Sequence, residues 1–156
     1  MRIHVVGVTA SGKSTMARRL ADRQGVPHVE LDALYWEADW TPARPADFRD
    51  RVERALAGEA WVVDGSYLMI RDLIWSRADT VVWLDFSLPR ILWQLLRRTL
   101  RRVARRETLW NGNRERLWTH LCTRDSLFLW VLTTFHRRQR EYSRLLGSLE
   151  NAHLRV

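Results

Sequence analysis

The chain has 156 residues, of which 46% are hydrophobic and nine are tryptophan, and this length predicts one domain over residues 1–156 with a core of its own. The single cysteine, Cys122, excludes an internal disulfide framework, and the longest apolar run, residues 127–135, is about half of what a membrane span needs. The N-terminal residues lack the apolar region of a signal peptide, so we expect a cytoplasmic protein. The formal net charge of +8 fits nucleic acid, an anionic membrane or a small polyphosphate ligand, and only the position of the charge can decide among them.

Short apolar runs alternate with helical patterns along the chain. Strands are predicted at residues 2–8, 28–31, 60–65, 80–85 and 152–156. Helices are predicted from residue 13 to the glycine at 25, at 44–60, 67–77 and 89–106, and after a polar interruption at 108–115 up to about 146. Because the strands are apolar throughout and alternate with helices, the order predicts an α/β fold with a parallel sheet covered on both faces.

The first predicted turn, GVTASGKST, matches the phosphate-binding pattern G-x-x-x-x-G-K-[ST] between a strand and a helix. Glycines allow successive N–H groups to turn inward around phosphate oxygens, and the helix N-terminus adds its positive end. Lys13 is the only lysine in a chain rich in arginine, and its compact ammonium suits the space between β- and γ-phosphates better than a planar guanidinium. The residues predicted to bind a nucleoside triphosphate are Gly7, Val8, Thr9, Ala10, Ser11, Gly12, Lys13, Ser14 and Thr15.

Three aspartates end predicted strands, where doubly wound sheets bind their ligands. Asp64 is expected to hold Mg²⁺ together with the hydroxyl of Ser14, because a phosphate-binding loop needs a carboxylate on a neighbouring strand. Asp85 is interpreted as the start of the next helix. Asp32 is followed by Tyr35, Trp36 and Trp40, so it is a candidate to hold an acceptor hydroxyl beside a stacked ring, while the same aromatics could equally belong to the core.

The helix predicted at 89–106 carries six arginines on one half of its circumference. Leucines, a valine and Trp93 occupy the other half, which we expect to be buried. Three interpretations of the basic face stay open: a solvated surface, a clamp on transferring phosphate with Arg98 and Arg102, or a surface for nucleic acid. The loop that follows, WNGNRE, predicts a lid at about 106–116 that brings Arg114 over the phosphates, although a plain connection would explain it too.

In this order, the segments GVTASGKST, VELDALYW, WVVDGSY, ADTVVWLD, NGNRE and FHRRQREY resemble the adenylate-kinase-like P-loop kinases. The resemblance is closest to the bacterial adenylate kinase-related group called DNA topology modulation proteins, and it covers nearly the whole chain. It implies the three-layer P-loop NTPase fold with a five-stranded parallel sheet, ATP with Mg²⁺ as donor, an acceptor site near Asp32 and a basic lid. Adenylate kinases carry an arginine soon after the Asp-Gly of the third strand, whereas Arg71 lies further along here, which makes AMP a doubtful acceptor.

The sequence therefore predicts an ATP-dependent phosphotransferase acting on a small acceptor, with a nucleotide or nucleoside expected. Its catalytic candidates are Lys13, Asp32, Arg98, Arg102 and Arg114, and its metal ligands are Ser14 and Asp64. The alternative is a nucleotide-binding protein whose basic helix engages DNA or RNA, with slow hydrolysis or none. The sequence leaves the oligomeric state undetermined.

Overall fold

The computed structural model describes residues 1–104, 109–113 and 126–156. Its sheet has four parallel strands in the order β2-β3-β1-β4. The strands are β1 (Arg2–Gly7), β2 (His28–Glu30), β3 (Trp61–Asp64) and β4 (Thr80–Leu84). The helices are α1 (Lys13–Gln24), α2 (Leu31–Tyr35), α3 (Pro45–Ala55), α4 (Arg71–Trp75), α5 (Leu88–Ala104) and α7 (Leu127–Leu146). Short 3-10 turns occur at Ala38–Trp40, Leu68–Ile70, Trp110–Gly112 and Leu149–Asn151.

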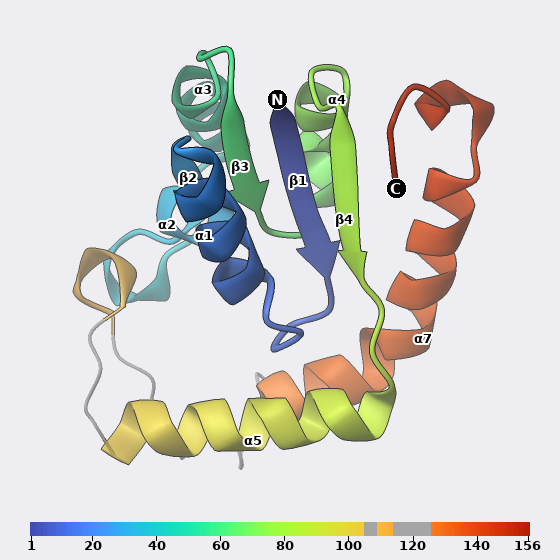
Figure 1. Cartoon of the computed structure of the whole chain (residues 1–156). Coiled ribbons are helices and arrows are strands. Elements are labelled where there is room, and N and C mark those ends of the chain that lie inside the picture. Colours follow the sequence, from blue (N-terminus) through green and yellow to red (C-terminus); the bar gives the residue numbers. More distant parts are fainter. Residues whose placement is uncertain (105–108, 114–125) are drawn as a thin grey trace.

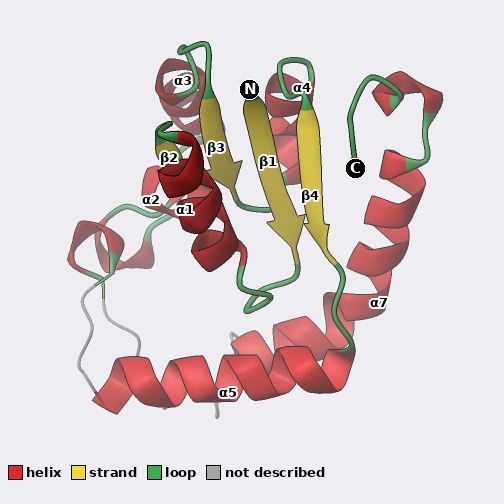
Figure 2. Cartoon of the chain, in the orientation of Figure 1, coloured by secondary structure: helices red, strands yellow, loops and turns green. Residues whose placement is uncertain are grey.

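Helices cover both faces of the sheet, because each strand presents apolar side chains alternately to the two sides. On one face, Ile3, Val5 and Val62 pack against Ala17 and Ala21 of α1. On the other face, side chains from α3, α4 and the end of α7 surround the strands. This larger core includes Val6, Val63, Val81, Phe48, Val52, Ile74, Trp75 and Tyr142. The predicted α/β fold with a covered parallel sheet is confirmed (Figures 1 and 2).

The carboxyl ends of the four strands meet at one edge of the sheet, and α5 lies across that edge (Figure 1). The start of α7 packs beside α5, and the helix then rises along β4. A third apolar cluster joins α5, α7 and the loop between β1 and α1, with Val8 from that loop, Ile91 and Leu95 from α5, and Val131 and Phe135 from α7. None of the helices in the described residues is long and apolar enough to cross a membrane.

The expected fifth strand at residues 152–156 is wrong for the described chain. Arg155 forms a single parallel bridge with Thr80, in which its N–H donates to Asp79 O (3.0 Å) and its carbonyl accepts from Val81 N (2.8 Å). The preceding residues form a turn in which Leu154 N–H donates to Asn151 O. Because that turn occupies the residues before Arg155, one residue is left to pair with β4.

The expected orientation of the arginine-rich helix is also wrong. On α5 the buried residues are Ile91, Leu95 and Thr99, whereas Trp93 is 64% exposed and Leu100 is 51% exposed. The helix is turned so that a mixed face, apolar in its first half and polar in its second, faces the strand ends. In the second half of the helix this face can be polar, because Arg98 and Arg102 line the cavity described below.

Asp85 does not begin α5, which starts at Leu88. Its carboxylate instead accepts hydrogen bonds from Gln139 Nε2 of α7, at 2.9 and 3.2 Å. This aspartate therefore ties the end of β4 to α7 and takes no part in lining the cavity described below.

Candidate active site

The loop between β1 and α1 has the tight geometry that phosphate binding requires. Gly7 has a φ of 151°, and a Cβ there would lie 2.8 Å from Leu84 O and 2.8 Å from Ser11 Oγ, so no other residue fits. Ser66 holds the same residue from the next strand end: its hydroxyl donates to Gly7 O (2.9 Å) and accepts from Gly7 N (3.2 Å). The α1 N-terminus, whose first N–H groups have no partner within the helix, follows directly.

Lys13 lies in the first turn of α1 and its Nζ donates to Val8 O at 2.9 Å. Burial lowers the pKa of Lys13, against the charges of Asp32 and Asp64, while the cations of Arg98 and Arg138 lower it further. The buried Lys13 ammonium is thus repelled by the neighbouring cations of Arg98 and Arg138. A bound polyanion would relieve this repulsion.

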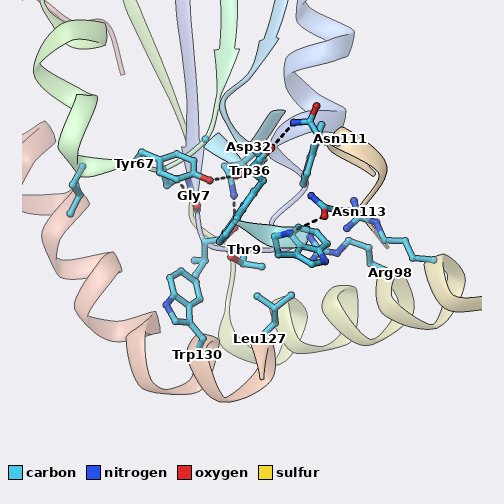
Figure 3. A pocket seen from close by; sticks show the side chains of 18 of the residues that line it. Gly7, Thr9, Asp32, Trp36, Tyr67, Arg98, Asn111, Asn113, Leu127 and Trp130 are labelled. Atoms are coloured by element: carbon cyan, nitrogen blue, oxygen red, sulfur yellow. Dashed lines mark hydrogen bonds between the residues drawn. The ribbon is translucent and has the colours of Figure 1, made fainter. Parts of the chain in front are cut away.

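A cavity of about 1320 Å³ opens above the loop. Its cations come from three helices: Lys13 from α1, Arg98 and Arg102 one turn apart on α5, and Arg138 on α7. Arg138 lies over the ring of Trp130 at 5.8 Å and has a side chain that is only 20% exposed. Figure 3 shows Arg98 and Trp130 reaching from their helices toward Asp32 and Tyr67 at the strand ends.

Asp64 lies at the end of β3, next to the strand that leads into the loop, as expected from the sequence. Its buried carboxylate accepts from two donors: Ser14 Oγ at 2.7 Å to Oδ2, and His28 Nε2 at 2.7 Å to Oδ1. The pairing with Ser14 follows from the loop motif and from the adjacency of the strands. The contact with His28 depends on β2 lying beside β3, which no sequence pattern indicates.

Asp32, in the first turn of α2, accepts a hydrogen bond of 2.5 Å from the hydroxyl of Tyr67. Burial raises the pKa of Tyr67, and the Asp32 charge and this hydrogen bond raise it further, so the phenol stays protonated and acts as donor. One carboxylate oxygen of Asp32 is therefore fixed by Tyr67. The other can accept from a hydroxyl group in the cavity.

The aromatic residues after Asp32 divide between core and cavity. Tyr35 packs edge-on against Phe48 and contacts Tyr67, with ring centroids 5.0 and 4.7 Å away. Trp36 and Trp40 contact each other at 5.7 Å and line the cavity. Tyr35 thus belongs to the core, whereas stacking of an acceptor ring on Trp36 or Trp40 stays a prediction.

Residues 109–113, the described part of the predicted lid, are bonded to the loop after α2. Asn113 is buried, accepts from Trp40 N (2.9 Å) and donates to Glu37 O (2.8 Å), and Asn111 donates to Trp36 O (2.6 Å) (Figure 3). Trp110 Nε1 donates to Glu30 at 3.0 Å. These bonds hold residues 110–113 against the loop after α2, and both segments line the cavity together with Asp32.

Half of the predicted site residues line one cavity, whereas Ala10, Ser11, Gly12, Ser14, Thr15 and Asp64 do not line it. Gly7, Val8, Thr9, Lys13, Asp32, Arg98 and Arg102 all line the cavity. Arg114 lies outside the described residues. The residues that sequence reasoning missed are His28, Ser66, Tyr67, Trp110 and Arg138. Of these, Ser66 and Tyr67 stand in the motif segment WVVDGSY and Arg138 stands in FHRRQREY, so the motifs contained these residues but did not indicate a role for them.

The residues present fit ATP with Mg²⁺. Ser14 and Asp64 offer a hydroxyl and a carboxylate 2.7 Å apart, which are oxygen ligands of the kind that Mg²⁺ prefers. Within residues 1–104, 109–113 and 126–156 there is no group of three or more His, Cys, Asp or Glu side chains that could hold a metal alone. A magnesium ion here would take its remaining ligands from phosphate oxygens and water.

No family model matches the chain. Among curated proteins it is 30% identical over 95 residues to an uncharacterized protein, YqaC, of Bacillus subtilis, covering 57% of this chain and 53% of that protein. It is 29% identical over 110 residues to a shikimate kinase of Synechococcus, covering 62% and 58%. The matches thus span between half and three fifths of these relatives.

Solved structures agree over more of the chain. A shikimate kinase from Bacteroides thetaiotaomicron has a TM-score of 0.57 at 15% identity, covering 92% of this chain and 82% of that one. A gluconokinase from Sinorhizobium meliloti has a TM-score of 0.54 at 24% identity, covering 85% and 73%. At these identities the likeness shows the fold alone: the chain shares its α/β fold with these two kinases.

Proposed function

We propose that the chain is an ATP-dependent P-loop kinase that transfers the γ-phosphoryl group of ATP to a hydroxyl of a small acceptor. One observation carries this proposal: four cations from three helices and the carboxylate of Asp32 line one cavity above the phosphate-binding loop. A cluster of cations suits a polyphosphate, and a carboxylate opposite them suits the hydroxyl that attacks it. The partial match to a shikimate kinase supports the same class.

On the donor side, the loop amides and Lys13 hold the β- and γ-phosphates. Arg98, Arg102 and Arg138 stabilise the charge that spreads over the transferring group. Mg²⁺, held through Ser14 and Asp64, would neutralise phosphate charge in the same place. Arg114, the lid residue expected from the sequence, stays a prediction.

On the acceptor side, Asp32 binds the attacking hydroxyl, and Tyr67 keeps the carboxylate oriented. The acceptor oxygen forms the new bond to phosphorus while the bond to the bridging oxygen breaks and ADP leaves. The hydroxyl proton passes to Asp32. Trp36, Trp40 and Trp110 supply flat apolar walls beside this carboxylate, which favours an acceptor with a planar ring such as a nucleoside or nucleotide.

The test is ADP formation from ATP and Mg²⁺ with a panel of nucleosides, nucleoside monophosphates, shikimate and gluconate. We expect one acceptor class to stimulate ADP formation and Lys13→Ala to abolish the stimulation. A flat rate with every acceptor would overturn the proposal. Membership of the adenylate kinase-related group remains a prediction that a nucleotide or nucleoside acceptor would support.

A matched pair of variants distinguishes the specific role of a cavity arginine from a general effect of positive charge. Arg98 lines the cavity, whereas its neighbour Arg97 is exposed. We expect Arg98→Ala to lower kcat about a hundredfold and Arg97→Ala to leave it nearly unchanged. Equal effects of the two variants would favour the nucleic-acid alternative. The same alternative would be favoured if the protein shows no acceptor-dependent turnover and binds DNA in a salt-sensitive way that survives Lys13→Ala.

A further inference from the structure

Asp64 is a buried carboxylate with a separate donor at each oxygen. Its side chain is 5% exposed, Ser14 Oγ lies 2.7 Å from Oδ2, and His28 Nε2 lies 2.7 Å from Oδ1. Burial of a carboxylate is costly unless its oxygens are hydrogen-bonded, so both contacts stabilise the side chain in this position. The three side chains form a hydrogen-bond network that runs from His28 through Asp64 to Ser14.

The direction of the Ser14 hydroxyl follows from this hydrogen-bond network. A serine hydroxyl has one hydrogen to donate and two lone pairs that accept. Because Asp64 carries no hydrogen when ionised, the Ser14 hydrogen points to Asp64 Oδ2, and the lone pairs of Ser14 point elsewhere. A lone pair is what a cation bound beside the phosphates needs.

The parallel pairing of β2 with β3 brings the His28 side chain within hydrogen-bond distance of Asp64. It opens β2, and in the parallel register it lies beside Val62, two residues before Asp64. Val62 packs against α1, and alternate residues of a strand share a face, so Asp64 also faces the helix that carries Ser14. The His28 side chain is 13% exposed, which leaves its imidazole little freedom to turn away from the carboxylate.

The other titratable groups near Asp64 cannot replace His28. The charge of Asp64 partly offsets the lowering of the Lys13 pKa by burial, but the Lys13 ammonium donates to Val8 O. The same charge partly offsets the lowering of the His4 pKa by burial, but the His4 Nε2 is hydrogen-bonded to Gly65 O. Within residues 1–104, 109–113 and 126–156, the side-chain donors to the Asp64 carboxylate are Ser14 and His28. Loss of the imidazole would leave Ser14 as the side chain that orients this carboxylate.

We propose that His28 is a positioning residue of the magnesium–nucleotide site. Its Nε2–H fixes the carboxylate of Asp64, which holds the Ser14 hydrogen and so presents the Ser14 oxygen to Mg²⁺. This inference rests on the proposed function, because it assigns His28 to the donor side of the same site. Outer groups that orient metal ligands typically contribute about 10- to 100-fold to metal affinity or activity.

The test compares ADP affinity with and without Mg²⁺, measured by calorimetry, in wild type, His28→Leu and His28→Gln. The glutamine amide reaches about as far as Nε2 and can donate to Asp64, whereas leucine cannot. We expect His28→Leu to weaken ADP binding about tenfold in Mg²⁺ and to leave metal-free ADP binding unchanged, with His28→Gln close to wild type. If the leucine variant does not fold, His28→Asn serves in its place, because its amide is too short to reach Asp64.

His153 provides a matched control, because its Nε2 contacts the backbone carbonyl of Trp75 at 2.9 Å and it does not line the cavity. His153→Leu should leave both affinities unchanged. An unchanged magnesium dependence in His28→Leu, equal losses with and without Mg²⁺, or failure of glutamine to restore binding would overturn the inference while the kinase proposal stands. Wild type without any magnesium-dependent ADP binding would overturn both.

Discussion

We predict that the buried His4 makes the free energy of unfolding fall as the pH drops below about 6.5. It lies in β1 and is 2% exposed. Its Nε2–H donates to Gly65 O (2.8 Å), and its Nδ1 accepts from Trp75 Nε1 (2.9 Å). Both ring nitrogens are thus used by the neutral form, and a proton on Nδ1 would face the N–H of Trp75.

Burial lowers the pKa of His4 to about 4, although the Gly65 carbonyl and the Asp64 charge favour the protonated ring. In the unfolded chain its pKa is about 6.5. As the pH falls, the unfolded state binds the proton first, so stability is lost from about pH 6.5 downward until the folded pKa is reached. The difference corresponds to roughly 3 kcal/mol in full, most of which is lost between about pH 7.5 and 4.5.

The assay is urea unfolding followed by tryptophan fluorescence at several pH values, in wild type and His4→Gln. Carboxylates titrate in both proteins, so the difference between the two curves isolates His4. We expect the variant to be less stable at pH 7.5 and to lose roughly 2 to 3 kcal/mol less on acidification. Parallel curves would refute the reasoning, as would an NMR titration of wild type that shows His4 protonated near pH 6.5.

Two further predictions concern the backbone and the acceptor side of the cavity. At Gly65, with a φ of 138°, an added Cβ would lie 2.7 Å from the side chain of Leu31, so Gly65→Ala should lower the free energy of unfolding by about 2 kcal/mol or more. Gly58→Ala is its control, because the nearest atom there is 3.9 Å away and the change should be nearly neutral in urea unfolding. Asn113→Ala removes two bonds to the loop after α2 and should raise the acceptor KM about tenfold while the ATP KM stays the same. Steady-state kinetics decide this, and an equal effect of Asn151→Ala, which removes a bond to Leu145 O outside the cavity, would contradict it.

The local sequence determined the parts of this protein whose chemistry is local. The glycines, Lys13 and Ser14 stand within eight residues of one another, and their spacing alone predicts a loop that turns from β1 into α1. Apolar runs separated by helical patterns likewise predicted a parallel sheet, because such strands must be covered on both faces. The position of Asp64 beside that loop followed from the same rules.

The tertiary structure decided what depends on distant elements meeting. The contact of His28 with Asp64 needs β2 beside β3, and Arg138 enters the cavity because α7 packs next to α5. The face of α5 is the clearest case: its apolar pattern predicts that Trp93 is buried, yet Trp93 is exposed and Arg98 lines the cavity. Whether an arginine turns inward is set by the charges and space across from it, and a sequence pattern on one helix contains no information about those.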